Sequence, residues 1–141
     1  MRFVRLTAEH IIALGDVASH KVSASDALDV EEWGGWAGID DNKLIGCGGI
    51  IEHPQWRGTG LAWTIMLRDW RKYARVVTHW VELELVASRF NRIEATCEAD
   101  NAGARRWLER LGFELEADAM RGVADGKDHA LYARIRDVEV V

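Results

Sequence analysis

The sequence predicts an α/β (α+β) protein with a mixed, mostly antiparallel sheet of six to seven strands and helices on both faces. Three observations lead to this fold class. Short segments of strand length recur along the chain, longer segments carry apolar residues at helical spacing, and turns rich in Asp, Asn and Gly connect them. The 141 residues correspond to a single domain, which we expect to span residues 1–141.

The chain begins with an alternating segment, residues 2–6, which predicts a short strand. Thr7 can cap a helix that starts at Ala8, because its hydroxyl can accept a hydrogen bond from the first turn. Either of the serines at 23 and 25 can cap a second short helix that runs toward Glu31. The first third of the sequence is therefore expected to form one strand and two helices.

A glycine-rich hairpin follows these helices. Residues 33–39 and 44–52 predict its two arms, with Asp-Asp-Asn-Lys as the turn. Six glycines in these arms weaken the strands, and two interpretations stay open. The glycines admit close packing against Trp33 and Trp36, or they leave backbone that a ligand approaches.

The next segment, residues 61–67 (LAWTIML), is an apolar run of strand length that follows a turn-like stretch, residues 57–60. If this run is the fourth strand, the next helix begins near Lys72 and every element has an ordinary length. If a helix began at Leu61 instead, it would extend to the strand at Arg92, far beyond the mean of about 11–12 residues. We favour the strand.

The C-terminal part has the clearest pattern. Residues 92–99 alternate and predict a strand. The helix after it, capped by Asp100 or Asn101, has an apolar face at i, i+3, i+4 and i+7 and a left-handed stop at Gly112. Two arms of a second hairpin, around an Asp-Gly turn, are predicted at residues 113–123 and 129–138.

Residues 101–113, NAGARRWLERLGF, follow a strand and precede the C-terminal hairpin. This segment resembles the GNAT family of N-acetyltransferases, whose element order matches the predicted one. The stretch from Gly46 to Ile135 is also similar to small GNAT-like proteins encoded by tailed phages, some of which are internal virion proteins. The matching pieces are GCGGII, GLAW with a hydrophobic strand, RIEAT, RWLERLGF and DGKDHALYAR.

The resemblance implies that acetyl-coenzyme A is bound as acyl donor and that an amine of a protein or small molecule is the acceptor. It also implies that the fourth and fifth strands diverge, so that free main-chain N–H groups hold the cofactor. The residues implied in cofactor binding are Met66 and Leu67 beside the thioester, Arg68, Arg71 and Lys72 beside the pyrophosphate, and Asn101 beside the pantetheine arm. Residues 57–62 (RGTGLA) also resemble the pyrophosphate loop of the family, an alternative that belongs to the register in which a helix begins at Leu61. Asn101 is equally well explained as a helix cap.

The catalytic groups are less well marked. GNAT enzymes often place a tyrosine on the last helix as the acid for the departing thiolate, and the corresponding position is Leu108, which has no usable proton. His53 and Glu52 are the candidate general bases, while Glu94 and Glu98 are expected at solvated positions. The alternative is a catalytically inactive GNAT-like structural or partner-binding protein, associated with a phage or a virion.

Composition bounds the possible partners. With 18 basic and 23 acidic residues the net charge is −5, which argues against nucleic acid. No apolar run approaches the length of a membrane span, and no His and Cys residues have metal-ligand spacing. Cys47 and Cys97 are expected as buried reduced thiols, which suits a cytoplasmic location, in the host cytoplasm or the virion if the protein is phage-encoded. Trp33, Trp36, Trp56 and Trp70 are the candidates for an exposed surface that binds a protein partner or a second copy.

Overall fold

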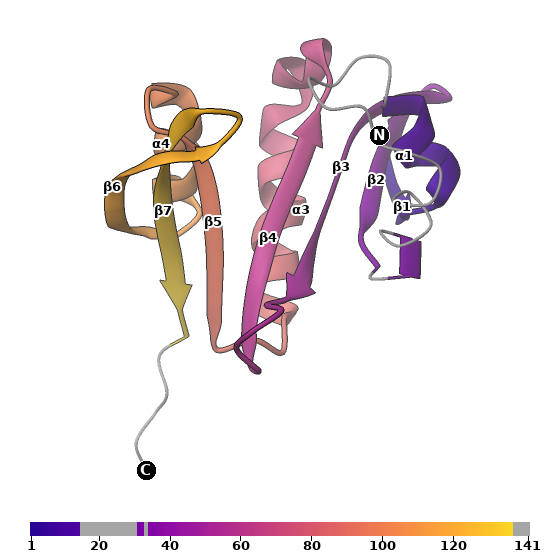
Figure 1. Ribbon diagram of the computed structural model, residues 1–141. Coiled ribbons are helices and arrows are strands. Elements are labelled where there is room, and N and C mark those ends of the chain that lie inside the picture. The colour runs from indigo at the N-terminus through magenta and orange to yellow at the C-terminus, as the bar shows by residue number, and fades with distance from the viewer. Residues whose placement is uncertain (15–30, 33, 137–141) are drawn as a thin grey trace. The chain divides into compact units, whose positions relative to one another are not determined.

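The computed structural model describes residues 1–14, 31–32 and 34–136 of the chain. The described strands form one mixed, mostly antiparallel sheet in the order β1-β2-β3-β4-β5-β7-β6, and the elements of the described residues include three α-helices, α1, α3 and α4 (Figure 1). This confirms the predicted fold class. The elements are β1 (Arg2–Arg5), α1 (Ala8–Leu14), β2 (Trp36–Asp40), β3 (Lys43–Glu52), β4 (Thr59–Met66), a 3-10 helix η1 (Arg68–Tyr73), α3 (Ala74–Ala87), β5 (Arg92–Glu98), α4 (Ala102–Arg110), β6 (Glu114–Ala124) and β7 (Lys127–Ile135).

The chain divides into two compact units. The first comprises Met1–Ile51 and Ala62–Trp80, and the second comprises Glu52–Leu61 and Val81–Val141. The division runs through β4 and through α3, so each of these elements contributes residues to both units. The predicted helix before Glu31 falls mostly on residues outside the described part.

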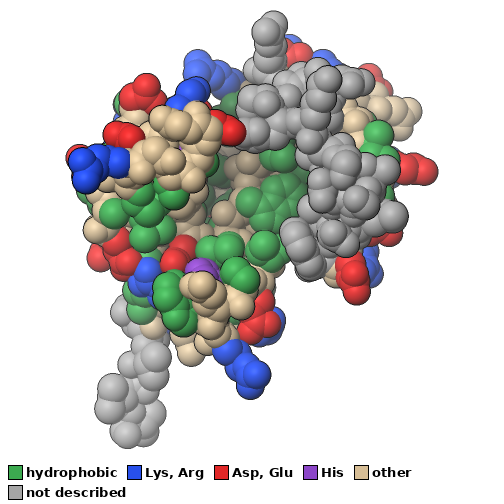
Figure 2. All heavy atoms as spheres, viewed as in Figure 1, with side chains coloured by type: hydrophobic (Ala, Val, Ile, Leu, Met, Phe, Trp, Pro, Cys, Tyr) green, Lys and Arg blue, Asp and Glu red, His purple; other side chains and the backbone are tan. Residues whose placement is uncertain are grey.

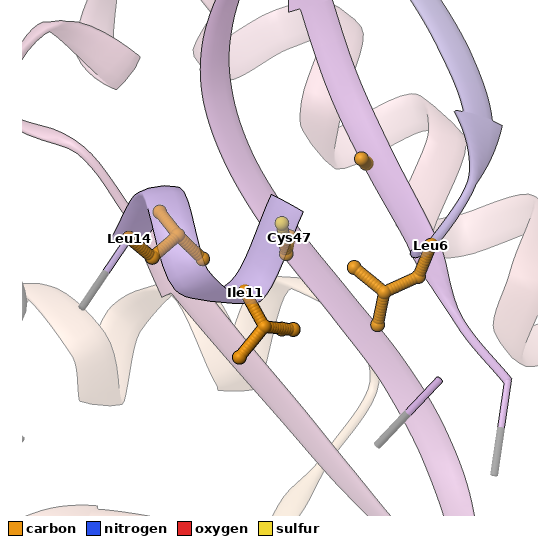
Figure 3. Packing of buried hydrophobic residues seen from close by; sticks show 5 residues of the cluster. Leu6, Ile11, Leu14 and Cys47 are labelled. Atoms are coloured by element: carbon orange, nitrogen blue, oxygen red, sulfur yellow. The ribbon is translucent and has the colours of Figure 1, made fainter. Parts of the chain in front are cut away.

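In the first unit, one face of the sheet packs against α1. Val4, Ala37 and Cys47 lie directly opposite one another across β1, β2 and β3, so their side chains share this face. Ile11 and Leu14 of α1 are buried over it, and Figure 3 shows both beside Cys47. The apolar spacing of α1 thus closes a small hydrophobic core.

The opposite face of the same strands packs against the start of α3. Phe3 and Trp36 point to this face, because side chains alternate along a strand. The Phe3 ring stacks on Trp80 of α3 with a centroid distance of 4.5 Å, and it meets Trp36 edge-on at 5.7 Å. Helices on both faces of the sheet are therefore confirmed in this unit.

Local signals placed the turns and the fourth strand correctly. Asp41 and Asn42 have φ angles of +50° and +60°, and Asp125 and Gly126 have +53° and +71°, as two-residue hairpin turns require. The LAWTIML run is β4, which confirms the favoured register. The strand begins at Thr59, two residues earlier than predicted, because β4 already pairs with β5 there.

In the second unit, β5 and β6 both pair with β7 in antiparallel register. Helix α4 ends as predicted. The N–H of Gly112 (φ +91°) bonds to the carbonyl of Glu109, and the N–H of Phe113 bonds to the carbonyl of Leu108. These two bonds, together with the buried side chains of Leu108 and Phe113, form a Schellman motif that stops the helix.

Two predictions about exposure need correction. Trp36 is 4% exposed, because its ring lies over Gly48 of β3 and meets the Phe3 ring edge-on, so it cannot belong to a partner surface. Trp56 is exposed as predicted, Trp70 is half-buried, and Trp33 lies outside the described residues. Cys47 is fully buried, whereas Cys97 is only partly buried.

On the face visible in Figure 2, basic and acidic side chains of the described residues alternate rather than gather in one patch. Of the helices that the structure describes, none is long and apolar enough to cross a membrane.

Candidate functional site

The end of β4 presents two residues with different surroundings. The N–H of Leu67 donates to the carbonyl of Ile45 on β3 at 3.0 Å, and its side chain packs against the core under α1. Successive N–H groups of a strand point to opposite edges. The N–H of Met66 is therefore directed to the edge away from β3, and the roles of Met66 and Leu67 in cofactor binding stay predictions.

The η1 helix follows directly and carries the predicted basic residues. Arg71 and Lys72 are exposed, while the side chain of Arg68 lies outside the described part of the structure. The carboxylate of Asp69 accepts a hydrogen bond from Lys43 at 2.9 Å, and the positive charge of Lys72 also acts on it. That bond lowers the pKa of Asp69. Exposed positive charge thus remains at the entry to α3.

A hydrogen bond ties the end of η1 to β2. The hydroxyl of Tyr73 donates to the carboxylate of Asp40 at 2.7 Å. The bond lowers the pKa of Asp40 and raises the pKa of Tyr73, because it stabilises the carboxylate and the protonated phenol together. The segment between β4 and α3 is consequently held at its C-terminal end by a side chain of the sheet.

Asn101 caps α4. Its Oδ1 accepts a hydrogen bond from the N–H of Ala104 at 3.0 Å, so the cap interpretation is confirmed. This contact leaves the amide nitrogen of Asn101 as the group that could bind a pantetheine carbonyl. The role in cofactor binding stays a prediction.

The two predicted bases lie where β3 ends. Nδ1 of His53 accepts hydrogen bonds from the N–H groups of Gln55 at 3.0 Å and Trp56 at 3.3 Å, and the ring stacks on Trp56. In the neutral ring, this arrangement places the proton on Nε2. Glu52 is exposed and pairs with Arg89 at 3.4 Å. Both residues have local structural contacts, and their catalytic roles stay predictions.

The sequence interpretation missed Glu94. It was expected at a solvated position, yet it is 7% exposed. The reason is its strand: β5 is an interior strand, in which Glu94 pairs with Leu61 of β4 on one side and Ala133 of β7 on the other. Alternation correctly placed Glu94 on the face opposite Ile93, but it could not report that this face is covered. The signal that could have found it is the interior position of β5 in the predicted sheet.

The Glu94 carboxylate is incompletely paired. Its Oε2 atom is buried and has no hydrogen-bond partner. The nearest cation is Arg92, whose Nη2 lies 3.7 Å away. Arg92 instead directs two hydrogen bonds, of 2.9 and 2.5 Å, to Glu116.

Comparison with solved structures shows many acetyltransferase folds. A probable acetyltransferase from Staphylococcus epidermidis has a TM-score of 0.78 and 10% identity, over 96% of this chain and 99% of that chain. The yncA protein of Salmonella typhimurium, solved with its cofactor acetyl-CoA, has a TM-score of 0.75 and 14% identity, over 100% and 98%. A variant of the spermidine N-acetyltransferase SpeG from Vibrio cholerae has a TM-score of 0.70 and 14% identity, over 96% and 95%.

Sequence comparison identifies the family. No curated protein matches the sequence, and the comparisons show no relationship specific to phage proteins. Residues 7–114, well over half of the chain, match the acetyltransferase (GNAT) domain. The chain therefore belongs to the GNAT acetyltransferase domain family.

Proposed function

We propose that this protein transfers the acetyl group of acetyl-coenzyme A to the nitrogen of an amine. The observation that carries the proposal is the end of β4, where a main-chain donor at Met66 is followed within a few residues by exposed Arg71 and Lys72. Family membership supports the same activity, since GNAT domains use this cofactor. Because the family match runs through residues of both compact units, we further propose that residues 1–141 act as a single acetyltransferase domain.

The residues present suit the chemistry of the cofactor. A pantetheine arm offers amide groups that a strand edge can hydrogen-bond, and the N–H of Met66 is such a donor. A pyrophosphate needs cations and helix N–H groups, which Arg71, Lys72 and the first turn of η1 provide. Asn101 is a further candidate through its amide nitrogen.

Acetyl-coenzyme A supplies the acetyl group as a thioester. The protein has to present an uncharged amine and accept a thiolate as the leaving group. Leu108 occupies the position where many GNAT enzymes carry a tyrosine, so the thiolate would leave without an acid from that helix position. This is chemically reasonable, because the pKa of a thiol is near 8.5. His53 and Glu52 remain candidate bases for the acceptor.

Binding and turnover test the proposal in two steps. Acetyl-coenzyme A at 100 times its dissociation constant should stabilise the protein by about 2.7 kcal/mol, which thermal unfolding measures. Release of free thiol on addition of an amine then reports transfer. Spermidine is a suitable first acceptor, because the structurally similar SpeG acts on it. No thermal shift at millimolar cofactor would contradict the proposal.

A second candidate function is a GNAT-fold protein that binds a partner without catalysis. The observation that favours it is Leu108, which is buried in the helix stop and carries no proton to donate. A thermal shift with acetyl-coenzyme A but no thiol release with any amine would support this second function.

A further inference from the structure

We propose that the turn between β2 and β3 is a positioning device, which holds η1 in the orientation that its exposed cations need to bind the pyrophosphate of the cofactor. The side chains through which it acts are Asp40 and Lys43 of the hairpin and Asp69 and Tyr73 of η1. This inference rests on the proposed acetyl transfer. It goes further by giving a role to residues that do not themselves have to touch the cofactor, and all four belong to the first compact unit.

Three hydrogen bonds connect the segment after β4 to the β2–β3 hairpin. At its start, the N–H of Leu67 donates to a main-chain carbonyl of β3 at 3.0 Å. In the middle, Nζ of Lys43 donates to Oδ2 of Asp69 at 2.9 Å. At the end, the hydroxyl of Tyr73 donates to Oδ2 of Asp40 at 2.7 Å. Because the three bonds are distributed from residue 67 to residue 73, rotation about any one of them is opposed by the other two.

The turn that supplies these contacts is a firm support. Asp40 and Lys43 are directly opposite each other at the end of the hairpin. The two residues between them have φ angles of +50° and +60°, as a tight two-residue turn requires. Both contacting side chains therefore come from the ends of paired strands, and groups carried by such elements are placed more accurately than groups on loops.

Within η1, the residues that contact the turn enclose the residues that are left exposed. Asp69 and Tyr73 contact the hairpin, whereas Arg71 and Lys72 between them are exposed. Lys72 is also the second cation that acts on Asp69, three residues before it. The bond from Lys43 gives Asp69 a partner outside η1, and so leaves the charge of Lys72 more available to a phosphate.

The bond between Tyr73 and Asp40 is charge-assisted. It lowers the pKa of Asp40 and raises the pKa of Tyr73, as expected when a phenol donates to an ionised carboxylate. Tyr73 is the last residue of η1 and is followed directly by the first residue of α3. Cations that are already in place bind an anion more tightly, because less conformational entropy is lost on binding. Loss of this bond should therefore weaken phosphate binding although every cation is retained.

Tyr73→Phe tests the inference without a change in charge, because it removes only the hydroxyl group. Inorganic pyrophosphate is the binding probe, and isothermal titration calorimetry gives its dissociation constant. That constant should rise by about 3- to 10-fold, the range that corresponds to loss of one intramolecular hydrogen bond. The kcat/KM for acetyl-coenzyme A should fall by a similar factor. The kcat/KM for S-acetylpantetheine, a thioester donor without phosphate groups, should stay unchanged.

Asp40→Ala gives a test in which two explanations predict opposite signs. If charge alone governed binding, removal of a carboxylate beside η1 would tighten the binding of pyrophosphate. If Asp40 acts through Tyr73, its removal weakens binding, and the double variant binds no more weakly than the weaker single variant. Asp40 also pairs with the N-terminal ammonium group at 3.2 Å, and Tyr73→Phe leaves that pair intact.

His10→Ala is the matched control. It removes a ring that accepts a hydrogen bond from the N–H of Thr7 at 3.0 Å, at the start of α1 in the same unit. This variant should bind pyrophosphate as the wild type does. An equal rise of the dissociation constant in His10→Ala and Tyr73→Phe would indicate a general loss of structure and overturn the inference. Unchanged binding in Tyr73→Phe, or tighter binding in Asp40→Ala, would overturn it as well.

The pyrophosphate probe separates failure of this inference from failure of the proposed function. If the wild type binds pyrophosphate but acetylates no amine, acetyl transfer is contradicted, and the comparison with Tyr73→Phe still decides the positioning role. If the wild type binds coenzyme A but not pyrophosphate, the same comparison is made with coenzyme A. If the wild type binds neither, both proposals are overturned. Transfer by the wild type, together with unweakened binding in Tyr73→Phe, would overturn the positioning role alone.

Discussion

The indole ring of Trp36 occupies the space in which a side chain at Gly48 would lie. The two residues are directly opposite each other across β2 and β3, and a Cβ atom at Gly48 would come within 2.6 Å of Trp36 Cζ2. The same relationship holds at Gly46, where a Cβ would meet the sulfur of Met66 at 2.6 Å. At Gly46 and Gly48 the structure therefore supports the close-packing interpretation of the glycine-rich hairpin.

Gly48→Ala should therefore destabilise the protein by about 1–3 kcal/mol, because the added methyl group overpacks a filled site. Chemical denaturation measures the change. Gly103→Ala is the control: its Cβ would have 3.7 Å of room beside Asn101 in the exposed first turn of α4. That substitution should stabilise by up to about 1 kcal/mol, because alanine is the better helix former. Equal effects at both sites would show that the Trp36 contact is unimportant.

Charge reversal at η1 should weaken cofactor binding. The double variant Arg71→Glu, Lys72→Glu should raise the dissociation constant of coenzyme A by about 100-fold or more, because each of the two lost charge-assisted hydrogen bonds costs about 1.5–3 kcal/mol. Isothermal titration calorimetry measures it. Arg57→Ala, in the exposed turn between β3 and β4, should leave the constant unchanged. If Arg57→Ala proves the more damaging variant, the phosphate site lies at that turn.

The two cysteines should differ in reactivity. Burial raises the pKa of Cys47 to about 12, so almost no thiolate forms at pH 8. Burial also raises the pKa of Cys97, partly opposed by Arg105, and this residue is only partly buried. With iodoacetamide at pH 8, mass spectrometry should find Cys97 alkylated before Cys47 in the native protein. Both should react rapidly in denaturant, and faster native labelling of Cys47 would contradict its burial.

The Tyr73–Asp40 hydrogen bond should stabilise the protein over a defined pH window. Asp40 has its pKa lowered by Tyr73 from the ordinary 3.8, so its contribution is present above that value and is lost as the pH falls through the lowered pKa. Tyr73 has its pKa raised by Asp40 from the ordinary 10.0, so its contribution is lost as the pH rises through the raised value. Tyr73→Phe should lower the urea midpoint at pH 7.

The difference between wild type and Tyr73→Phe should shrink at strongly acidic and strongly alkaline pH, because one partner then changes its protonation state. Asp69→Asn provides a comparison, since its pair with Lys43 is exposed on both sides and should contribute little. A difference between wild type and Tyr73→Phe that is constant from acid to alkaline pH would contradict a charge-assisted bond.

Local sequence alone determined the turns, the end of helix α4 and the assignment of residues 61–67 to a strand. Asp-Asn and Asp-Gly adopt positive φ angles wherever the neighbouring segments pair, and Gly112 stops α4 through hydrogen bonds made within the same turn. LAWTIML could be assigned to a strand because a helix that began at Leu61 would have to extend to the strand at Arg92. Each of these features depends on residues that are close together in the chain, so a single sequence is sufficient to predict it.

Only the tertiary structure decided which side chains are buried and which backbone N–H groups are already bonded within the sheet. Alternation reports the side of a strand to which Glu94 points, but only the pairing of β5 with its two neighbours buries that side chain. Likewise, the apolar pattern of β4 does not predict that the N–H of Leu67 bonds to the carbonyl of Ile45. Because of this bond, the N–H of Met66 is directed to the edge of β4 away from β3. Burial and the direction of backbone donors arise from contacts between residues far apart in sequence, and such contacts leave no local pattern.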